Sequence, residues 1–290
     1  MPRRIAFINE KGGSGKTTLV ANLAAHLCLR RGRRVLGIDM DPQGHLGKCL
    51  GIDVRAQRRT SIELLVDSVL GSAAPATART AVPGDLPTIG TRIRNLDIVV
   101  SNKSLALYPA WAGAERSEPT GRLLEVLDDS TQLAQYDFVL FDAPPSFGSI
   151  TLSILRACDE VVIPVPLTYL ALEGSAEMLR TVELVRTRYD NPGLRVTMVI
   201  PTFHRRTKLA AEILGQLQRQ FPKELAQTVV GYHVKIDEAQ SRGRTIFEYA
   251  PNDKGAHAMA ALAEELEARG CEPEEPRFDE SEGTALGDAG

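Results

Sequence analysis

Residues Asn9–Leu19 read NEKGGSGKTTL, and this stretch decides the fold. It follows the phosphate-binding pattern G-x-x-x-x-G-K-[ST], except that Glu10 stands where the first glycine usually is. The apolar run Ile5–Asn9 precedes it, and the amphipathic stretch Thr18–Arg31 follows it. A strand, a glycine-rich turn and a helix start are the setting in which backbone N–H groups and the helix dipole bind phosphate. The stretch therefore predicts a nucleotide-binding loop.

The residue types of the loop fit the chemistry of a nucleoside triphosphate. We expect Lys16 to neutralise the β- and γ-phosphates and the Thr17 hydroxyl to bind Mg²⁺. The predicted nucleotide-binding residues of the loop are Lys11, Gly12, Gly13, Ser14, Gly15, Lys16, Thr17 and Thr18.

A second lysine, Lys11, stands at the start of the same loop. It is either a solvated loop residue or a residue that acts on another molecule. A lysine that points away from its own loop cannot easily reach the nucleotide there, but it could reach a nucleotide in a second subunit, as an arginine finger does. Chemistry alone leaves both interpretations open.

Three carboxylates stand at the carboxyl ends of predicted strands. Asp39 and Asp41 lie in IDMDPQG, and their spacing of two places them on one face of an extended segment. One of them could orient the attacking water, and the other could hold Mg²⁺ or the loop. Asp142 ends the apolar run in YDFVLFDAPPS, which is the position of a magnesium-binding aspartate in P-loop proteins.

Short apolar runs alternate with amphipathic stretches along the chain. This pattern predicts an α/β fold, doubly wound, with a mostly parallel sheet covered by helices on both faces. The further strands we expect are Val35–Met40, Leu96–Val100, Phe138–Phe141, Val161–Val165 and Val196–Ile200. The further helices we expect are Thr120–Leu133, Leu172–Arg188, Lys208–Phe221 and Gly255–Arg269.

Charge is distributed unevenly. The formal net charge is −3, but ten of the 37 acidic residues and two of the 34 basic residues follow Met259. We expect one domain over residues 1–270, with a surface insertion at 71–93 that is rich in Ala, Pro, Thr and Gly. Residues 271–290 are predicted to be an acidic, disordered tail.

The four cysteines form no C-x-x-C pair, and the five histidines have no metal-binding spacing. The chain shows no secretory leader and no apolar run of about 18 residues, so neither secretion nor a membrane span is expected. An anionic membrane would also repel the acidic tail. We expect a cytoplasmic protein with reduced thiols.

Three motifs in this order, KGGSGKTT, IDMDPQG and FVLFDAPPS, resemble the deviant-Walker-A ATPases of the ParA/MinD group, and more closely its ParA/Soj branch. The segments VVIPVPLTYLALEGSAEML (161–179) and VKIDEAQSRGRTIFEYAPNDKGAHAMAALAEEL (234–266) are similar to that branch as well. The likeness spans about residues 3–269 and is weak over 52–118.

The resemblance implies a slow, partner-stimulated ATPase that uses ATP and Mg²⁺. Lys11 falls on the family's signature lysine, which crosses an ATP-sandwiched homodimer to the partner's phosphates. Gly12 falls on a glycine that must be small for two subunits to approach, and Asp41 on the aspartate that positions the hydrolytic water. The resulting site residues are Asp41, Lys11 and Lys16 for catalysis and Thr17, Asp39 and Asp142 for the metal.

The chain departs from the family pattern in two places. IPTFHRRT (200–207) replaces a Thr-Met-Tyr/Phe-Asp type of run that lies near the nucleotide base in the family. We expect Pro201 in this segment to bind the nucleotide. In VVGYHVKIDEAQS (229–241), Gly231, Tyr232 and His233 replace Pro-Arg-Asn. No helix-turn-helix extension precedes the loop, so sequence-specific operator binding is not expected.

The region from Arg180 to Lys254 holds thirteen basic and eight acidic residues. It could form a face that binds the backbone of double-stranded DNA without reading its sequence, or its charges could be ordinary solvated helix charges. The residues we expect to contact DNA are Arg205, Lys208, Arg219, Lys235, Arg242 and Arg244.

The leading hypothesis is therefore a partition ATPase. It dimerises on ATP, binds nonspecific DNA, associates with the nucleoid and segregates chromosome or plasmid DNA through a ParB-like adaptor. The alternative is a positioning ATPase of the same type, for a protein cluster or a division regulator. A binding module without hydrolysis is disfavoured by the full set Lys16, Thr17, Asp41 and Asp142.

Overall fold

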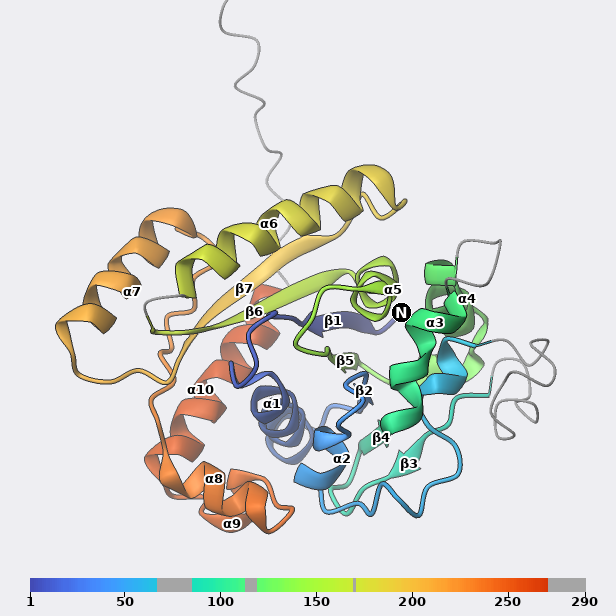
Figure 1. Ribbon diagram of the computed structural model, residues 1–290. Helices are drawn as coiled ribbons and strands as arrows, with labels where there is room; N and C mark the ends of the chain where they lie inside the picture. Colours follow the sequence, from blue (N-terminus) through green and yellow to red (C-terminus); the bar gives the residue numbers. More distant parts are fainter. Residues whose placement is uncertain (67–84, 113–118, 169–170, 271–290) are drawn as a thin grey trace, which may run out of the picture.

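A seven-stranded sheet forms the centre of the computed structural model, which describes residues 1–66, 85–112, 119–168 and 171–270 (Figure 1). The strand order is β3-β4-β2-β5-β1-β6-β7. β3 pairs antiparallel with β4, and every other pair is parallel. The strands are β1 (Arg3–Phe7), β2 (Val35–Asp39), β3 (Ile89–Gly90), β4 (Leu96–Val99), β5 (Phe138–Asp142), β6 (Glu160–Pro166) and β7 (Arg195–Thr202).

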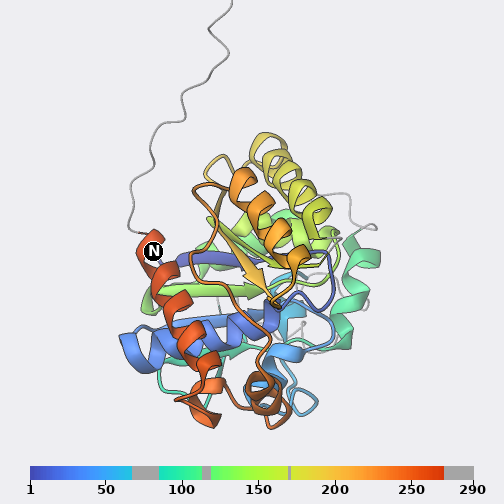
Figure 2. The same ribbon diagram turned by 90° about the vertical axis from the view of Figure 1, so that its left-hand side faces the viewer.

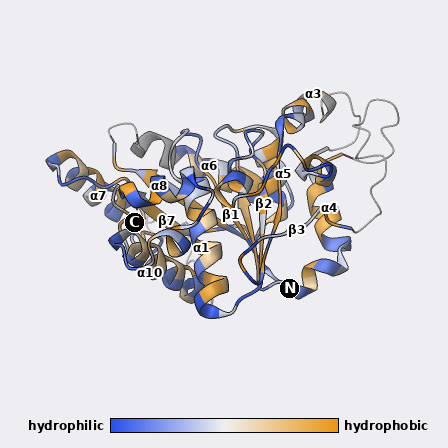
Figure 3. Cartoon of the chain, turned by 90° about the horizontal axis from the view of Figure 1, so that it is seen from below, coloured by the Kyte–Doolittle hydropathy of each residue, from blue (hydrophilic) through white to orange (hydrophobic). Residues whose placement is uncertain are grey.

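Helices cover both faces of this sheet, so β2, β5 and β6 are buried along their whole length. One hydrophobic cluster lies under α1 (Lys16–Arg31), α2 (His45–Cys49), α8 (Val234–Ser241), α9 (Ile246–Tyr249) and α10 (Lys254–Arg269). The other lies under α3 (Tyr108–Ala112), α4 (Arg122–Asp129), α5 (Ser149–Ala157), α6 (Ala171–Arg188) and α7 (Lys208–Gln220). The view in Figure 2 shows the two helix layers on opposite sides of the strands, and Figure 3 shows apolar strands between helices with hydrophilic outer sides. The predicted doubly wound, mostly parallel fold is confirmed.

The strands predicted from the sequence are all present, with ends that agree within about two residues. The helix predicted over Thr120–Leu133 is wrong in its extent. α4 ends at Asp129, because Ser130 is extended with φ −82° and ψ 112°. Short 3-10 turns, Pro119–Gly121 and Thr131–Gln135, flank it.

The insertion predicted at 71–93 needs correction at its end. Residues 67–84 lie outside the described residues, but Ile89–Gly90 form β3 and pair with β4. The chain therefore rejoins the sheet before the predicted insertion ends. The predicted tail, 271–290, lies outside the described residues.

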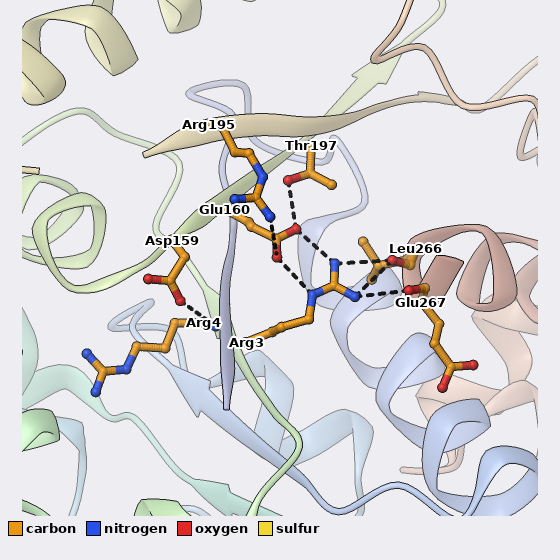
Figure 4. A network of polar contacts seen from close by, with 8 residues as sticks. All are labelled: Arg3, Arg4, Asp159, Glu160, Arg195, Thr197, Leu266 and Glu267. Carbon is orange, nitrogen blue, oxygen red and sulfur yellow. Dashed lines mark hydrogen bonds and ion pairs between the residues drawn. The ribbon is translucent and has the colours of Figure 1, made fainter. Parts of the chain in front are cut away.

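A polar network fixes the amino ends of β1 and β6 against α10 (Figure 4). Arg3 donates to both carboxylate oxygens of Glu160 at 2.8 Å and to the carbonyls of Leu266 and Glu267 at 3.2 Å. Thr197 on β7 donates to Glu160 at 2.7 Å. Burial alone would raise the pKa of Glu160, but the bonds from Arg3 and Thr197 outweigh it and hold that pKa below its ordinary value. The network therefore stabilises the ionised carboxylate inside the protein.

Candidate active site

The predicted phosphate loop lies between β1 and α1 at the carboxyl edge of the sheet. Gly13 and Gly15 have φ values of 71° and 96°, which residues with a Cβ rarely adopt. Gly15 is the N-cap of α1, and no side chain caps the helix there. The first N–H groups of α1 are therefore available to an anion, as phosphate binding requires.

β7 holds the loop from the other side. The hydroxyl of Thr202, the last residue of β7, donates to the carbonyl of Ser14 at 3.0 Å. Both residues are buried. The end of an edge strand far along the sequence thus fixes the position of the loop.

Lys16 lies inside the loop and is 6% exposed. Its ammonium donates to the carbonyl of Asn9 at 2.8 Å and to that of Lys11 at 3.5 Å. Burial lowers the pKa of Lys16, while Asp142 and Asp41 act in the opposite direction. The lysine is therefore encircled by its own loop, where a phosphate on the loop would meet its charge.

Thr17 and Asp142 form the pair best suited to a metal. The Thr17 hydroxyl donates to one Asp142 oxygen at 2.7 Å. The other oxygen, Oδ1, is buried and has no hydrogen-bond partner among the described residues. Burial raises the pKa of Asp142 to about 7, although Thr17 and Lys16 lower it. A hydroxyl beside a buried carboxylate that lacks a partner fits Mg²⁺, which prefers oxygen ligands.

Asp39 occupies a different environment, although its Cα is paired with that of Asp142 across β2 and β5. It is fully buried, and its two oxygens accept the N–H groups of Asp41 at 3.1 Å and Leu46 at 3.0 Å. Burial, with Asp142 nearby, raises the pKa of Asp39 well above its ordinary value. Both oxygens of Asp39 therefore already serve N–H groups of this segment, which favours a role in holding the turn that carries Asp41 over the predicted metal-binding role.

Asp41 stands beyond the strand, in the turn that leads to α2. It is half-buried, and its Oδ1 accepts the N–H of Gln43 at 2.9 Å. Gly44 then turns the chain with φ 63°, and a Cβ there would lie 2.5 Å from the carbonyl of Ser101. The turn that carries Asp41 therefore requires glycine at position 44.

Lys11 makes its side-chain hydrogen bond outside its own phosphate loop. Its ammonium donates to the hydroxyl of Thr168, in the loop after β6, at 2.9 Å. Asn9 supports this arrangement, since its side chain accepts the N–H of Lys11 at 2.8 Å and donates to the carbonyl of Pro164 at 2.6 Å. Neighbouring Gly12 is exposed, and a Cβ added to it would meet nothing within 4 Å.

A pocket adjoins the start of α1. It is lined by Gly15, Thr18, Leu19, Thr202, Phe203, Val230, Gly231, Tyr232, His233, Ile236, Asp237 and Met259. Phe203 has a φ of 53°, and its ring lies 3.7 Å from where a Cβ on Gly15 would be. The pocket therefore begins where the phosphate loop ends, which suits the base and ribose of a nucleotide.

The predicted Pro201 lies in β7, and it accepts the N–H of Val230 through its carbonyl at 2.9 Å. It is not among the residues that line the pocket; the next two residues, Thr202 and Phe203, are. Sequence reasoning missed these two, together with Tyr232 and Asp237, although it had marked both segments as departures. Tyr232 donates to Asp237 at 2.7 Å, and both residues line the pocket.

The six predicted DNA-binding residues are all exposed and form two groups. Arg205, Lys208 and Arg219 lie on α7 and the loop before it. Lys235, Arg242 and Arg244 lie on α8 and the turn after it, where Lys235 pairs with Glu238 at 2.8 Å and Arg242 donates to Tyr249 at 2.7 Å. A bridge between His204 and Gly231 brings the two segments side by side.

Comparison with known proteins supplies relatives over most of the chain. A family model described as AAA domain matches residues 2–196. The chromosome-partitioning ATPase Soj of Thermus thermophilus is 40% identical over 268 residues, which cover 92% of this chain and 96% of that protein. The cell division protein PomZ of Myxococcus xanthus is 35% identical, over 91% of this chain and 77% of that protein.

A solved structure is similar in both fold and sequence. The cobyrinic acid a,c-diamide synthase of Mycobacterium smegmatis, with bound ATP analog and magnesium, has a TM-score of 0.72 and 28% identity. The match covers 91% of this chain and 93% of that chain. Within the described ranges, every helix of the present chain is too short or too polar to cross a bilayer.

Proposed function

The chain belongs to the Soj/ParA family of P-loop partition ATPases, and from this membership we propose that it works as an ATP-dependent dimerising switch on DNA. It is an ATPase that uses ATP and Mg²⁺. Two subunits join when both hold ATP, the dimer binds duplex DNA without reading its sequence, and hydrolysis releases it. A ParB-like adaptor links the switch to chromosome or plasmid DNA, so the protein associates with the nucleoid.

The orientation of Lys11 carries this proposal. A lysine in the phosphate loop that donates to Thr168 at 2.9 Å serves no group of its own loop. A Cβ on neighbouring Gly12 would meet nothing within 4 Å, so no residue that the structure describes requires a small side chain there. Both observations support a role for the loop's outer side against a second subunit, whose phosphates Lys11 would reach.

The remaining residues act within one subunit. Lys16 and the N–H groups at the start of α1 hold the phosphates, and Thr17 with Asp142 would hold the metal. Mg²⁺, when bound, neutralises charge on the β- and γ-phosphate oxygens. Asp41 orients the attacking water, while Asp39 keeps the turn that carries Asp41 in place.

The exposed basic residues on α7 and α8 support contact with DNA phosphates. One subunit offers only a small number of these basic residues. A dimer offers twice as many, which raises the avidity for DNA without any new kind of contact. Binding would therefore depend on ATP and fall steeply with salt, because each phosphate contact releases counterions.

A positioning ATPase for a protein cluster or division regulator is the second candidate. The similarity to PomZ and the unusual Gly231–His233 segment favour it. The nucleotide switch would be the same in this case, and a protein scaffold would take the place of DNA as the binding surface.

The test is binding of the Asp41→Ala protein to a duplex of arbitrary sequence, with ATP and with ADP, at about 50 mM and about 200 mM salt. We expect binding with ATP alone that weakens strongly at the higher salt. The matched control is the same protein with Lys11→Ala added, which should not bind. Absence of binding with either nucleotide would reject the DNA-based switch and leave the positioning ATPase.

A further inference from the structure

Thr18 lies where the phosphate loop, the adjoining pocket and α8 meet. It belongs to the first turn of α1, and it lines the pocket. No side chain caps this turn, so its N–H groups are available to an anion. The Thr18 hydroxyl can add one more hydrogen bond to a phosphate oxygen there, provided that its proton is not used elsewhere.

Gln240 of α8 provides the partner of this hydroxyl. The side-chain amide of Gln240 donates to the Thr18 hydroxyl oxygen at 2.7 Å, so it fills one of the two acceptor positions of that oxygen. The Thr18 hydroxyl donates to no residue that the structure describes. Its proton is therefore left for a ligand, and a hydroxyl that already accepts a hydrogen bond is the stronger donor.

The same bond selects the side-chain conformation of Thr18. A threonine in a helix divides between two χ1 rotamers, because its hydroxyl can also bond to a carbonyl of the preceding turn. The bond from Gln240 fixes the rotamer in which the hydroxyl meets α8. Thr18 is among the residues that line the pocket, whereas Gln240 is not. Gln240 would therefore act on a ligand through Thr18 and not by direct contact.

The segment that contains α8 and α9 has other anchors to the rest of the protein. One turn after Thr18, the side chain of Asn22 accepts the N–H of Ile246 at 2.8 Å in a buried bond. Arg92 donates to a carbonyl at the end of α2 and to another in the turn after α8. Loss of the Gln240 donor would therefore leave this segment in place and release only the Thr18 hydroxyl.

We propose that Gln240 is a positioning residue for nucleotide binding, which holds the Thr18 hydroxyl so that its proton is directed to a phosphate oxygen. The inference rests on nucleotide binding at the start of α1 and not on the DNA switch. A failure of the switch would appear in duplex binding by the Asp41→Ala protein. A failure of the present inference would appear in the ADP affinity of single subunits.

Calorimetric titration with ADP and Mg²⁺ tests the inference without the ATP-dependent dimer. The proteins compared are the unmodified chain, Gln240→Leu, Thr18→Val and the double variant Gln240→Leu/Thr18→Val. Leucine keeps the helix propensity of glutamine and removes its donor. We expect Gln240→Leu to weaken ADP binding about three- to tenfold and Thr18→Val to weaken it at least about tenfold. The double variant should bind ADP no more weakly than Thr18→Val.

The double variant distinguishes an effect through Thr18 from any other effect of Gln240. The inference would be overturned if Gln240→Leu weakened ADP binding by the same factor in the Thr18→Val background, or if it left the ADP affinity of the unmodified chain unchanged. Gln218→Leu, on the exposed side of α7, is the matched control and should bind ADP normally. The melting temperature of Gln240→Leu without nucleotide should stay within about 2 °C of that of the unmodified chain.

Gln240→Glu keeps the shape of the side chain and its bond to Thr18 but reverses the direction of that bond. A carboxylate only accepts, so the Thr18 proton would turn toward it and away from the ligand. We expect ADP binding to weaken at least about tenfold. Ser241→Glu adds the same charge at an exposed residue whose hydroxyl bonds within α8, and it should change the affinity less than about twofold. Equal losses in Gln240→Glu and Ser241→Glu would overturn the inference, because charge alone would then explain them.

Discussion

The ammonium of Lys11 lies 2.9 Å from the hydroxyl of Thr168, so β1's loop and the loop after β6 are joined by a bond between exposed groups. An exposed bond of this kind contributes little to stability, because water competes for both partners. Lys11 is therefore free to exchange Thr168 for a stronger acceptor, such as a phosphate of a second subunit.

Replacing Lys11 by alanine should leave ATP binding almost unchanged and abolish the ATP-dependent dimer. Each of the two lysines would lose a charge-assisted bond of about 1.5–3 kcal/mol, which weakens the dimer at least about 100-fold. Light scattering after size-exclusion chromatography with ATP measures this. Lys254→Ala, an exposed lysine at the start of α10, is the control. A stable ATP dimer of Lys11→Ala would reject the role across the interface.

Gly12→Val should fold normally and still fail to dimerise. A Cβ at this position meets nothing within 4 Å, and the residue is not in the left-handed region, so the subunit has room for valine. The melting temperature without nucleotide should therefore stay within about 2 °C of the unmodified chain. A large drop in that temperature would mean that the glycine serves the subunit itself. A normal ATP dimer would mean that the interface does not approach Gly12.

Part of the site can be predicted from sequence because its signals are local. Gly15, Lys16 and Thr17 belong to one motif, and Asp142 ends a short apolar run whose length favours a buried strand. Thr202, Phe203 and Tyr232 join the pocket only because β7 lies beside β6 and because His204 pairs with Gly231. No local pattern marks such residues.

The short helices were missed for a related reason. α8 is held by Gln240, which donates to Thr18 at 2.7 Å, and α9 by its Ile246 N–H, which donates to the side chain of Asn22 at 2.8 Å. Such contacts between distant residues decide whether helices this short form, since their own propensity is insufficient.

Lys16→Ala and Asp41→Ala should separate binding from hydrolysis. Lys16 is enclosed by the loop, so its removal should abolish ATP binding. The hydrogen bond of the Asp41 side chain goes to Gln43 in its own turn and not to the phosphate loop, so Asp41→Ala should bind ATP, dimerise and turn over at least about 100-fold more slowly. Filter binding and phosphate release measure the two properties, with Asp129→Ala on the exposed end of α4 as control. Ordinary hydrolysis by Asp41→Ala would refute its assignment to the water.

Glu160→Gln should destabilise the fold in a pH-dependent way. Breaking a buried ion pair from one side costs about 3–5 kcal/mol, since Arg3 loses its partner. The pKa of Glu160 is lowered in the folded state, so its contribution is present above its unfolded value of about 4.5 and is lost as the pH falls through the folded pKa. Urea unfolding should show a large difference from the unmodified chain at pH 7 that shrinks below pH 4. Glu183→Gln, which removes an exposed pair, should cost less than about 1 kcal/mol at either pH. A difference that persists in acid would contradict the charge-based account.

Asp142→Asn should stabilise the protein without metal and nucleotide, and weaken its response to both. Burial raises the pKa of Asp142 to about 7, so the folded state becomes less stable as the pH rises from about 4 to 7 and the buried carboxyl loses its proton. Asparagine avoids this penalty and can still accept from Thr17. In EDTA at pH 8 the variant should be more stable by a few kcal/mol, about 4 at most. Added ATP and Mg²⁺ should then raise the melting temperature of the unmodified chain much more than that of the variant. If the variant were the less stable protein in EDTA, the buried oxygen without a partner would have a structural role, and the proposed metal position would have to move.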